Sequence, residues 1–298
     1  MTAGSCVRSI PVMGTIATIE VAGSESCEEA VASAFEWFRQ IEQCCSRFDP
    51  HSELTQLNSQ IGVAVTASAI LYEAVRFALS VAEETGGAFD PTIGGRMEKA
   101  GFNREYRTGR LVQTAVDTNS QVSYRDVILN PDGKAITLLR PLLLDLGAVA
   151  KGLAVDMAAR ELQPFENFAI DAGGDLYLAG SNPEGDPWSV GIRHPRIDGQ
   201  LIESIRVSNQ AVCTSGDYER GEHILDPRRA EAAAGAASVT AASVTVVASG
   251  AMLADAVATA AFVLGPVEGL RLFDRVGVEG LIVSPSLERY QTRGMPYG

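Results

Sequence analysis

The sequence is short of the residues that most often reveal a metal or redox site. It has three histidines in 298 residues and five cysteines, which are Cys6, Cys27, Cys44, Cys45 and Cys213. The cysteines are odd in number and lack CxxC spacing, which excludes a framework of paired zinc-binding motifs. We therefore expect all five to be thiols in a reducing compartment, with no zinc site.

Positive charge is also scarce. The chain has 24 basic and 37 acidic side chains, which gives a formal net charge of -13. Nucleic-acid backbones and anionic membranes are bound through clustered Lys and Arg. This balance excludes nucleic acid and an anionic membrane surface as expected partners.

A membrane segment is not expected either. The N-terminus lacks the apolar core of a secretory signal. The most apolar region, residues 244–264, carries Asp255 near its middle, where a charge costs roughly 2.5–3.5 kcal/mol in a membrane. We expect a strand followed by a buried helix there, with no membrane span. The protein is then expected to be cytoplasmic, or periplasmic if the chain shown is trimmed.

Hydrophobic periodicity predicts an α+β fold. Helices are expected at residues 26–45, 52–58, 67–85, 145–162 and 249–264, and a helix and strand over 267–283. The first helix should have one apolar face, made by Val31, Phe35, Phe38, Ile41 and Cys45, and Ser52 is the expected cap of the second. The helix at residues 145–162 should bury one face, because its apolar residues fall in a stripe at Leu146, Val149, Leu153, Met157 and Leu162. Strands are expected at residues 16–21, 127–129, 135–139, 142–144, 168–170, 188–193, 201–207, 211–214 and 244–247. Strands grouped between helices, with a hairpin turn at residues 130–134, favour antiparallel and mixed sheets flanked by helices. We expect a single domain over residues 1–298.

Residues 142–180 organise the chain. A strand ends at Asp145, which stands where a helix N-cap belongs. Gly147 and Gly152 each cost the following helix about 1 kcal/mol, so something is expected to approach its backbone closely. Lys151, in the first turns, could neutralise a phosphate or be an ordinary solvated lysine. Residues 171–175, which contain two acids and two glycines, could form a site or only a turn.

Asp255 lies in a helix that is apolar on every side, so it needs a partner if it is buried. Thr259 lies four residues on and therefore on the same face. A carboxylate and a hydroxyl on one face suit Mg²⁺, which also keeps waters and binds substrate phosphates. The alternative is a carboxylate paired with a buried Arg or with backbone amides.

The three histidines differ in how strongly their sequence surroundings indicate a functional role. His51 and His194 lie in polar turns and are expected to have no special role. His223 opens a short apolar strand just after a small, polar run at residues 214–218.

Together these stretches resemble the ApbE family, the Mg²⁺-dependent FAD:protein FMN transferases. The matching pieces lie, in the family's order, at residues 13–15, 47–54, 87–92, 145–152, 171–175, 214–220, 223–228 and 254–259. The resemblance implies that the enzyme splits FAD, moves FMN to a Thr or Ser of a target flavoprotein, and releases AMP.

The resemblance also implies roles for single residues. The metal ligands would be Asp255, Thr259 and the backbone carbonyl of Ala148. The residues that contact FAD would be Met13, Ala88, Phe89, Asp90, Asp145, Lys151 and Ile224. His223 is the candidate general base, with Asp217 and then Asp226 as alternatives.

Two features depart from the family's pattern. A single His223, preceded by Glu222, replaces tandem histidines on a longer loop, and Arg229-Ala230 follow Arg228 where Thr-Gly is usual. Two other functions therefore stay open: an FAD pyrophosphatase that yields FMN and AMP, and a flavin-binding protein without turnover.

Overall fold

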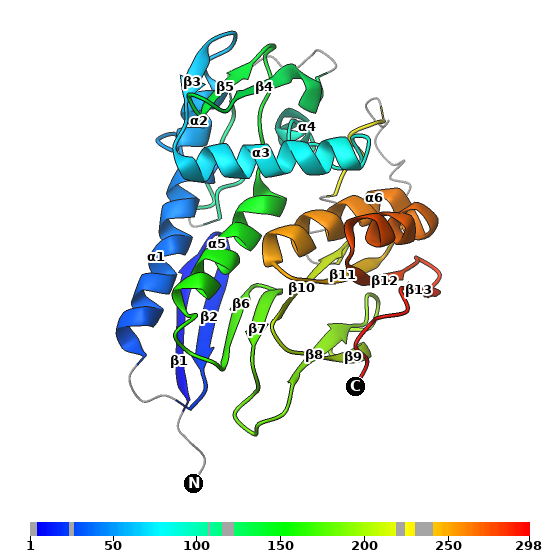
Figure 1. Ribbon diagram of the computed structural model, residues 1–298. Helices are drawn as coiled ribbons and strands as arrows, with labels where there is room; N and C mark the ends of the chain where they lie inside the picture. Colours follow the sequence, from blue (N-terminus) through cyan, green and yellow to red (C-terminus); the bar gives the residue numbers. More distant parts are fainter. Residues whose placement is uncertain (1–4, 24–26, 107, 115–121, 219–223, 230–240) are drawn as a thin grey trace. The chain divides into compact units, whose positions relative to one another are not determined.

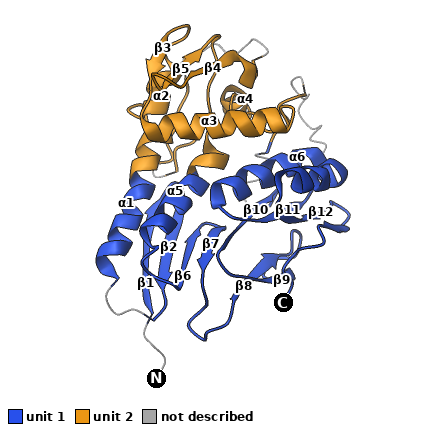
Figure 2. Cartoon of the chain, viewed as in Figure 1, with its two compact units in different colours: residues 1–39, 151–224, 238–298 blue, residues 40–150, 225–237 orange. Residues whose placement is uncertain are grey.

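The structure is a computed structural model that describes residues 5–23, 27–106, 108–114, 122–218, 224–229 and 241–298. It has the α+β fold that the periodicity predicts, with antiparallel sheets and helices (Figure 1). The chain divides into two compact units (Figure 2). Unit 1 comprises residues 1–39, 151–224 and 238–298, and unit 2 comprises residues 40–150 and 225–237. The single domain over residues 1–298 stays a prediction.

Unit 1 is built on an eight-stranded sheet in the order β1-β2-β6-β7-β10-β11-β12-β13, antiparallel throughout. Its strands are β1 (Cys6–Val12), β2 (Thr15–Val21), β6 (Phe168–Ala172), β7 (Asp175–Ala179), β10 (Gln210–Gly216), β11 (Ser243–Ala248), β12 (Glu279–Val283) and β13 (Arg289–Gln291). A separate pair, β8 (Trp188–Arg193) and β9 (Leu201–Val207), packs apolar side chains against it. Trp188, Ile205, Val247 and Leu281 meet in this core.

The helix α6 (Ala251–Val276) packs along β10, β11 and β12 within unit 1 (Figure 1). It joins the two helices expected at residues 249–264 and after residue 267, with a kink between them where Gly265, with φ of 77°, precedes Pro266. By length and composition it could cross a membrane, but 61% of its apolar window is buried inside the protein. This burial agrees with the predicted core helix.

Two further helices begin in one unit and end in the other. They are α1 (Glu28–Cys45) and α5 (Gly147–Glu161). The predicted apolar face of α1 is confirmed, since Val31, Phe35, Phe38, Ile41 and Cys45 are all buried.

Unit 2 carries α2 (Glu53–Asn58), α3 (Ala69–Glu84), α4 (Gly94–Lys99), the short 3-10 helix η1 (Tyr124–Asp126) and the sheet β3 (Ala64–Thr66)-β5 (Ala135–Leu138)-β4 (Val127–Asn130). The predicted cap of α2 is confirmed, because Ser52 Oγ accepts from the Thr55 N–H at 3.0 Å. Ser68 caps α3 in the same way, with the Leu71 N–H at 3.1 Å. The predicted hairpin of β4 and β5 is also present.

Three predictions about local structure need correction. The expected strand at residues 142–144 is reduced to one bridge between Leu143 and Ile93. The cause is Asn58, whose side-chain amide bonds the N–H and carbonyl of Leu144 in place of a second strand. In α5, Leu153 and Met157 are half-buried where a buried stripe was expected. Strands β1, β3, β7 and β13 were not predicted at all.

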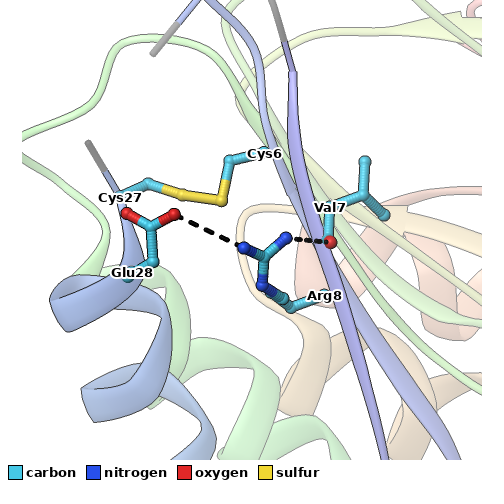
Figure 3. The surroundings of a disulfide bond; sticks show 5 residues. All are labelled: Cys6, Val7, Arg8, Cys27 and Glu28. Carbon is cyan, nitrogen blue, oxygen red and sulfur yellow. Dashed lines mark hydrogen bonds and ion pairs between the residues drawn. A yellow bond between two sulfur atoms is a disulfide. The ribbon is translucent and has the colours of Figure 1, made fainter. Parts of the chain in front are cut away.

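The cysteine prediction is wrong for one pair. Cys6 of β1 and Cys27, just before α1, form a disulfide beside the exposed pair of Arg8 and Glu28 (Figure 3). The two cysteines lie 21 residues apart, and their proximity depends on β1, so the spacing alone did not indicate it. Cys44, Cys45 and Cys213 are buried thiols, as predicted.

Candidate functional site

Unit 1 contains a buried cluster of charged side chains around Lys151. Its ammonium donates to Oδ2 of Asp175, which begins β7 and is 2% exposed. Burial alone would lower the pKa of Lys151, but the charges of Asp175 and Asp255 outweigh it and raise that pKa. Lys151 is therefore a fixed cation, and the alternative of a solvated lysine is wrong.

Asp255 and Thr259 lie one turn apart on α6, as the sequence predicts. Asp255 is 8% exposed, and its charge acts on Lys151. The Thr259 hydroxyl lies 3.3 Å from that of Ser215 on β10. The buried thiol of Cys213 is nearby, and burial, followed by the charges of Asp175 and Asp255, raises its pKa. Among the described residues, this cluster brings two carboxylates, those of Asp175 and Asp255, to the ammonium of Lys151.

The amino end of α6 meets α5 at very close range. A Cβ on Gly152 would lie 2.6 Å from the backbone of Ala251 and Met252, so only glycine fits there. This confirms the expected close approach at Gly152. One turn further along α5, Asp156 accepts from the Ala251 N–H at 2.6 Å and the Met252 N–H at 3.0 Å. Burial raises the pKa of Asp156, although these hydrogen bonds and Arg160 oppose the rise.

In unit 2, Asp145 caps the start of α5 as predicted. Its Oδ1 accepts from the Gly147 N–H at 2.7 Å, and its Oδ2 lies 2.6 Å from Nε of Arg47. Arg47 also donates to the carbonyl of Phe102 and lies over the ring of Phe48. Its buried Nη1 has no hydrogen-bond partner among the described residues, which leaves a donor for a ligand. Arg47 lies in the matching stretch of residues 47–54 but was not predicted as a flavin contact.

Three of the predicted flavin contacts of unit 2, Ala88, Phe89 and Asp90, are buried. Asp90 Oδ1 accepts from the N–H and hydroxyl of Thr92, and its Oδ2 accepts from the Tyr124 N–H at 2.9 Å. Burial raises the pKa of Asp90 despite these bonds. The carboxylate therefore holds this turn in place.

Ala148, the third predicted metal ligand, is the point where α5 departs from helical geometry. Its φ of -90° and ψ of 17° lie in the sparsely populated bridge region, where active-site residues often occur. It belongs to unit 2, while Asp255 and Thr259 belong to unit 1. Its role as a ligand stays a prediction.

The two alternative bases are both held by arginine. Asp217 accepts two hydrogen bonds from the Arg196 guanidinium, at 2.7 and 2.8 Å. Asp226 is bonded by Arg228 at 2.9 and 3.0 Å. Burial would raise the pKa of Asp226, but these bonds outweigh it and lower that pKa. Asp226 is therefore a weaker base than an ordinary carboxylate.

The positions of the remaining predicted residues say little about their roles in a site. His223 lies outside the described residues, and Ile224 is half-buried at the end of a segment of unit 1. Met13 has φ of 52° in the turn between β1 and β2. His194 has the plain role expected of it, since its Nδ1 accepts from the Arg196 and Ile197 amides, both at 3.1 Å.

Comparison with known proteins decides the family. A model of the ApbE family matches residues 13–282. The chain belongs to the ApbE family. A curated FAD:protein FMN transferase of Treponema pallidum is 31% identical over 312 aligned positions, covering 93% of this chain and 84% of that protein.

Solved structures of the ApbE family share the fold. The ApbE protein of Thermotoga maritima superposes with a TM-score of 0.84 at 28% identity, over 97% of both chains. The flavin transferase ApbE of Vibrio cholerae gives a TM-score of 0.83 at 25% identity, over 98% of both chains. The architecture predicted from the sequence is therefore that of the family.

Proposed function

We propose that this ApbE-family chain is an FAD:protein FMN transferase that uses Mg²⁺ and modifies a Thr or Ser hydroxyl of a target flavoprotein. The curated relatives that it resembles carry the name of this activity. The observation that carries the chemical part of the proposal is the buried cluster of Lys151, Asp175, Asp255 and Thr259 in unit 1.

The described side chains proposed as ligands carry hard oxygen atoms, which suit Mg²⁺. Asp255 and Thr259 offer hard oxygen atoms one helical turn apart, and Ala148 is the proposed third ligand. Mg²⁺ takes few protein ligands of this kind and completes its shell with water and phosphate oxygens. When bound, the ion would offset charge on the pyrophosphate of FAD.

The residues of the chain then have separate roles in the transfer. The acceptor hydroxyl oxygen attacks the phosphorus on the FMN side of the pyrophosphate, and the bond from that phosphorus to the bridging oxygen breaks. AMP leaves with the bridging oxygen, and the hydroxyl proton passes to a base. Lys151 supplies a fixed positive charge for the phosphates, since its raised pKa keeps it protonated.

We assign the base to His223 from the family resemblance. The engagement of Asp217 with Arg196 and of Asp226 with Arg228 supports this choice over the two carboxylates. Arg47 in unit 2 is a further candidate contact for FAD, because of its buried Nη1.

The second candidate function is hydrolysis of FAD to FMN and AMP. Two departures from the family pattern favour it. There is a single histidine in place of the tandem pair, and Arg229-Ala230 stand in place of Thr-Gly after Arg228. Arg228 and Arg229 both pair with Asp226. Water would then replace the acceptor hydroxyl, with the same residues in the same roles.

The compartment is a separate proposal. A cytoplasmic location was expected from the sequence, but a disulfide of Cys6 and Cys27 is typical of an oxidising compartment. We propose that the protein works in an oxidising compartment, which agrees with the periplasmic location given above as the alternative to the cytoplasm. Maleimide labelling of cells lysed in acid would leave Cys6 and Cys27 unlabelled, and labelling of all five cysteines would place the protein in a reducing compartment.

Asp255→Asn tests the metal assignment. The amide keeps the shape but loses the charge that would hold the cation, so AMP release from FAD should collapse, as it should for the wild-type protein in EDTA. The fold should survive, because a neutral amide costs less to bury than a charged carboxylate. If Asp255 is instead one half of a structural ion pair, the variant should lose roughly 3–5 kcal/mol of stability. A variant that melts early but turns over FAD with normal Mg²⁺ dependence would refute the assignment.

A further inference from the structure

The helix α6 lacks a cap of its own. Its N-cap residue is Gly250, and no side chain at that position bonds the free amides of the first turn. These amides need an acceptor when they are buried. Asp156 of α5 supplies both of its oxygens, one to the Ala251 N–H and one to the Met252 N–H.

The contact between the two helices is tighter than ordinary helix packing. Gly152 brings α5 against the backbone of Ala251 and Met252, and Gly250 leaves room for the Asp156 carboxylate, which would lie 3.1 Å from a Cβ there. A larger residue at Gly152 would push the start of α6 away, since the atoms it would meet are backbone atoms.

This contact lies between two residues of the proposed site. Lys151 precedes Gly152 on α5, and Asp255 lies one turn after Ala251 on α6. Any shift of the start of α6 along α5 therefore changes the distance between the Lys151 ammonium and the Asp255 carboxylate. A shift would also move Thr259, which follows on the same helical face.

We propose that Asp156 is a positioning residue, which fixes the start of α6 on α5 and so sets Asp255 and Thr259 in the geometry that binds the divalent cation. The proposal rests on the proposed function, because it concerns the same cation site. Asp156 acts through the backbone of the first turn of α6, where it accepts from the Ala251 and Met252 N–H groups. Residues that orient metal ligands typically change metal affinity 10- to 100-fold when they are replaced.

Asp156→Asn is the test variant. The amide retains one acceptor, and its NH₂ group then faces a backbone N–H, which breaks one of the two bonds. Because burial already disfavours the charged form of Asp156, the neutral side chain should be tolerated and the protein should fold. Glu279→Gln is the matched control, since Glu279 is a carboxylate of unit 1 that accepts from the Gly294 N–H at 3.0 Å and from Thr292, away from α5.

The measurement is the Kd of Mg²⁺ for each purified variant by calorimetry, together with the melting temperature and the Mg²⁺ dependence of AMP release. We expect Asp156→Asn to raise the Kd about 10-fold or more, with much of kcat recovered at saturating Mg²⁺. We expect Glu279→Gln to leave the Kd unchanged, even if it melts earlier.

Two outcomes are distinguishable. If Asp156→Asn melts early but binds Mg²⁺ with the wild-type Kd, Asp156 is only a structural cap and this inference is refuted. If the wild-type protein itself neither binds Mg²⁺ nor releases AMP, the proposed function fails instead. Should Asp156→Asn not fold, Asp156→Glu keeps the charge but displaces it by one methylene, and the same two outcomes apply to it.

Discussion

Replacement of Asp175 by Asn should destabilise the protein far more than replacement of a carboxylate in an exposed ion pair. Asp175 is 2% exposed and is the direct partner of Lys151, whose side chain is 17% exposed. Removing one partner of a buried pair strands the other charge and typically costs about 3–5 kcal/mol. Asp255 still acts on Lys151, so we expect the lower end, about 3 kcal/mol.

The matched control is Glu268→Gln on α6 of the same unit. Glu268 pairs with Arg271 at 2.6 Å, but the two side chains are 50% and 66% exposed. Such surface pairs contribute about 0–1 kcal/mol. At roughly 2–4 °C per kcal/mol, Asp175→Asn should lower the Tm by about 6–12 °C, and the control by about 4 °C at most.

The pH dependence of the stability that Asp175→Asn loses relative to the wild-type protein gives a second readout. In the wild-type protein the pKa of Lys151 is raised above 10.5, so the stabilising contribution is complete below pH 10.5 and is lost only above it. In the variant, burial without Asp175 lowers that pKa, so stability rises with pH as Lys151 gives up its proton. The deficit should therefore be largest near pH 7 and smaller at pH 10. Equal Tm values for Asp175→Asn and Glu268→Gln would refute the buried pair.

Two further predictions concern the disulfide and the base. Cys6→Ser should lower stability by about 3 kcal/mol, as expected for closure of a loop of this length, and dithiothreitol should lower the Tm of the wild-type protein but not of the variant; an unchanged wild-type Tm in reductant would contradict the disulfide. If His223 is the base, the rate of AMP release should rise with pH as its imidazole loses its proton, and His223→Ala should bind FAD but lose about 10²–10⁴-fold in rate. Asp226, whose pKa is lowered from 3.8, would be ionised throughout pH 5–8, so a flat profile with an active His223→Ala variant would move the role to a carboxylate.

Local signals in the sequence predicted the elements whose cause is local. The buried face of α1 follows from apolar spacing, and the cap at Ser52 follows from its own side chain. The strand at residues 142–144 was wrongly predicted, because Asn58, 86 residues away, bonds Leu144 in place of a neighbouring strand. Strand β1 was missed, although Met13-Gly14, with φ of 52° and 76°, is a two-residue hairpin turn that could have indicated it.

In the candidate site, too, the features with a local cause were predictable from the sequence and those that depend on distant residues were not. Asp255 and Thr259 could be paired because both lie on one helix, and Gly152 could be flagged because glycine is costly in a helix. The roles of Asp156 and Asp175 depend on contacts with residues 95 and 24 positions away, which no periodicity reveals. The disulfide of Cys6 and Cys27 likewise depends on the tertiary placement of β1.

The most direct test of the account is a flavin transfer assay. The purified protein is incubated with FAD, Mg²⁺ and a flavoprotein that the Vibrio cholerae flavin transferase modifies, with that transferase as positive control and an acceptor whose target hydroxyl residue is replaced by Ala as negative control. We predict flavin fluorescence on the acceptor in a denaturing gel, a mass increase equal to FMN, and one AMP released for each FMN attached. AMP with free FMN and an unmodified acceptor would contradict the transferase and favour the pyrophosphatase, and the absence of AMP would contradict both.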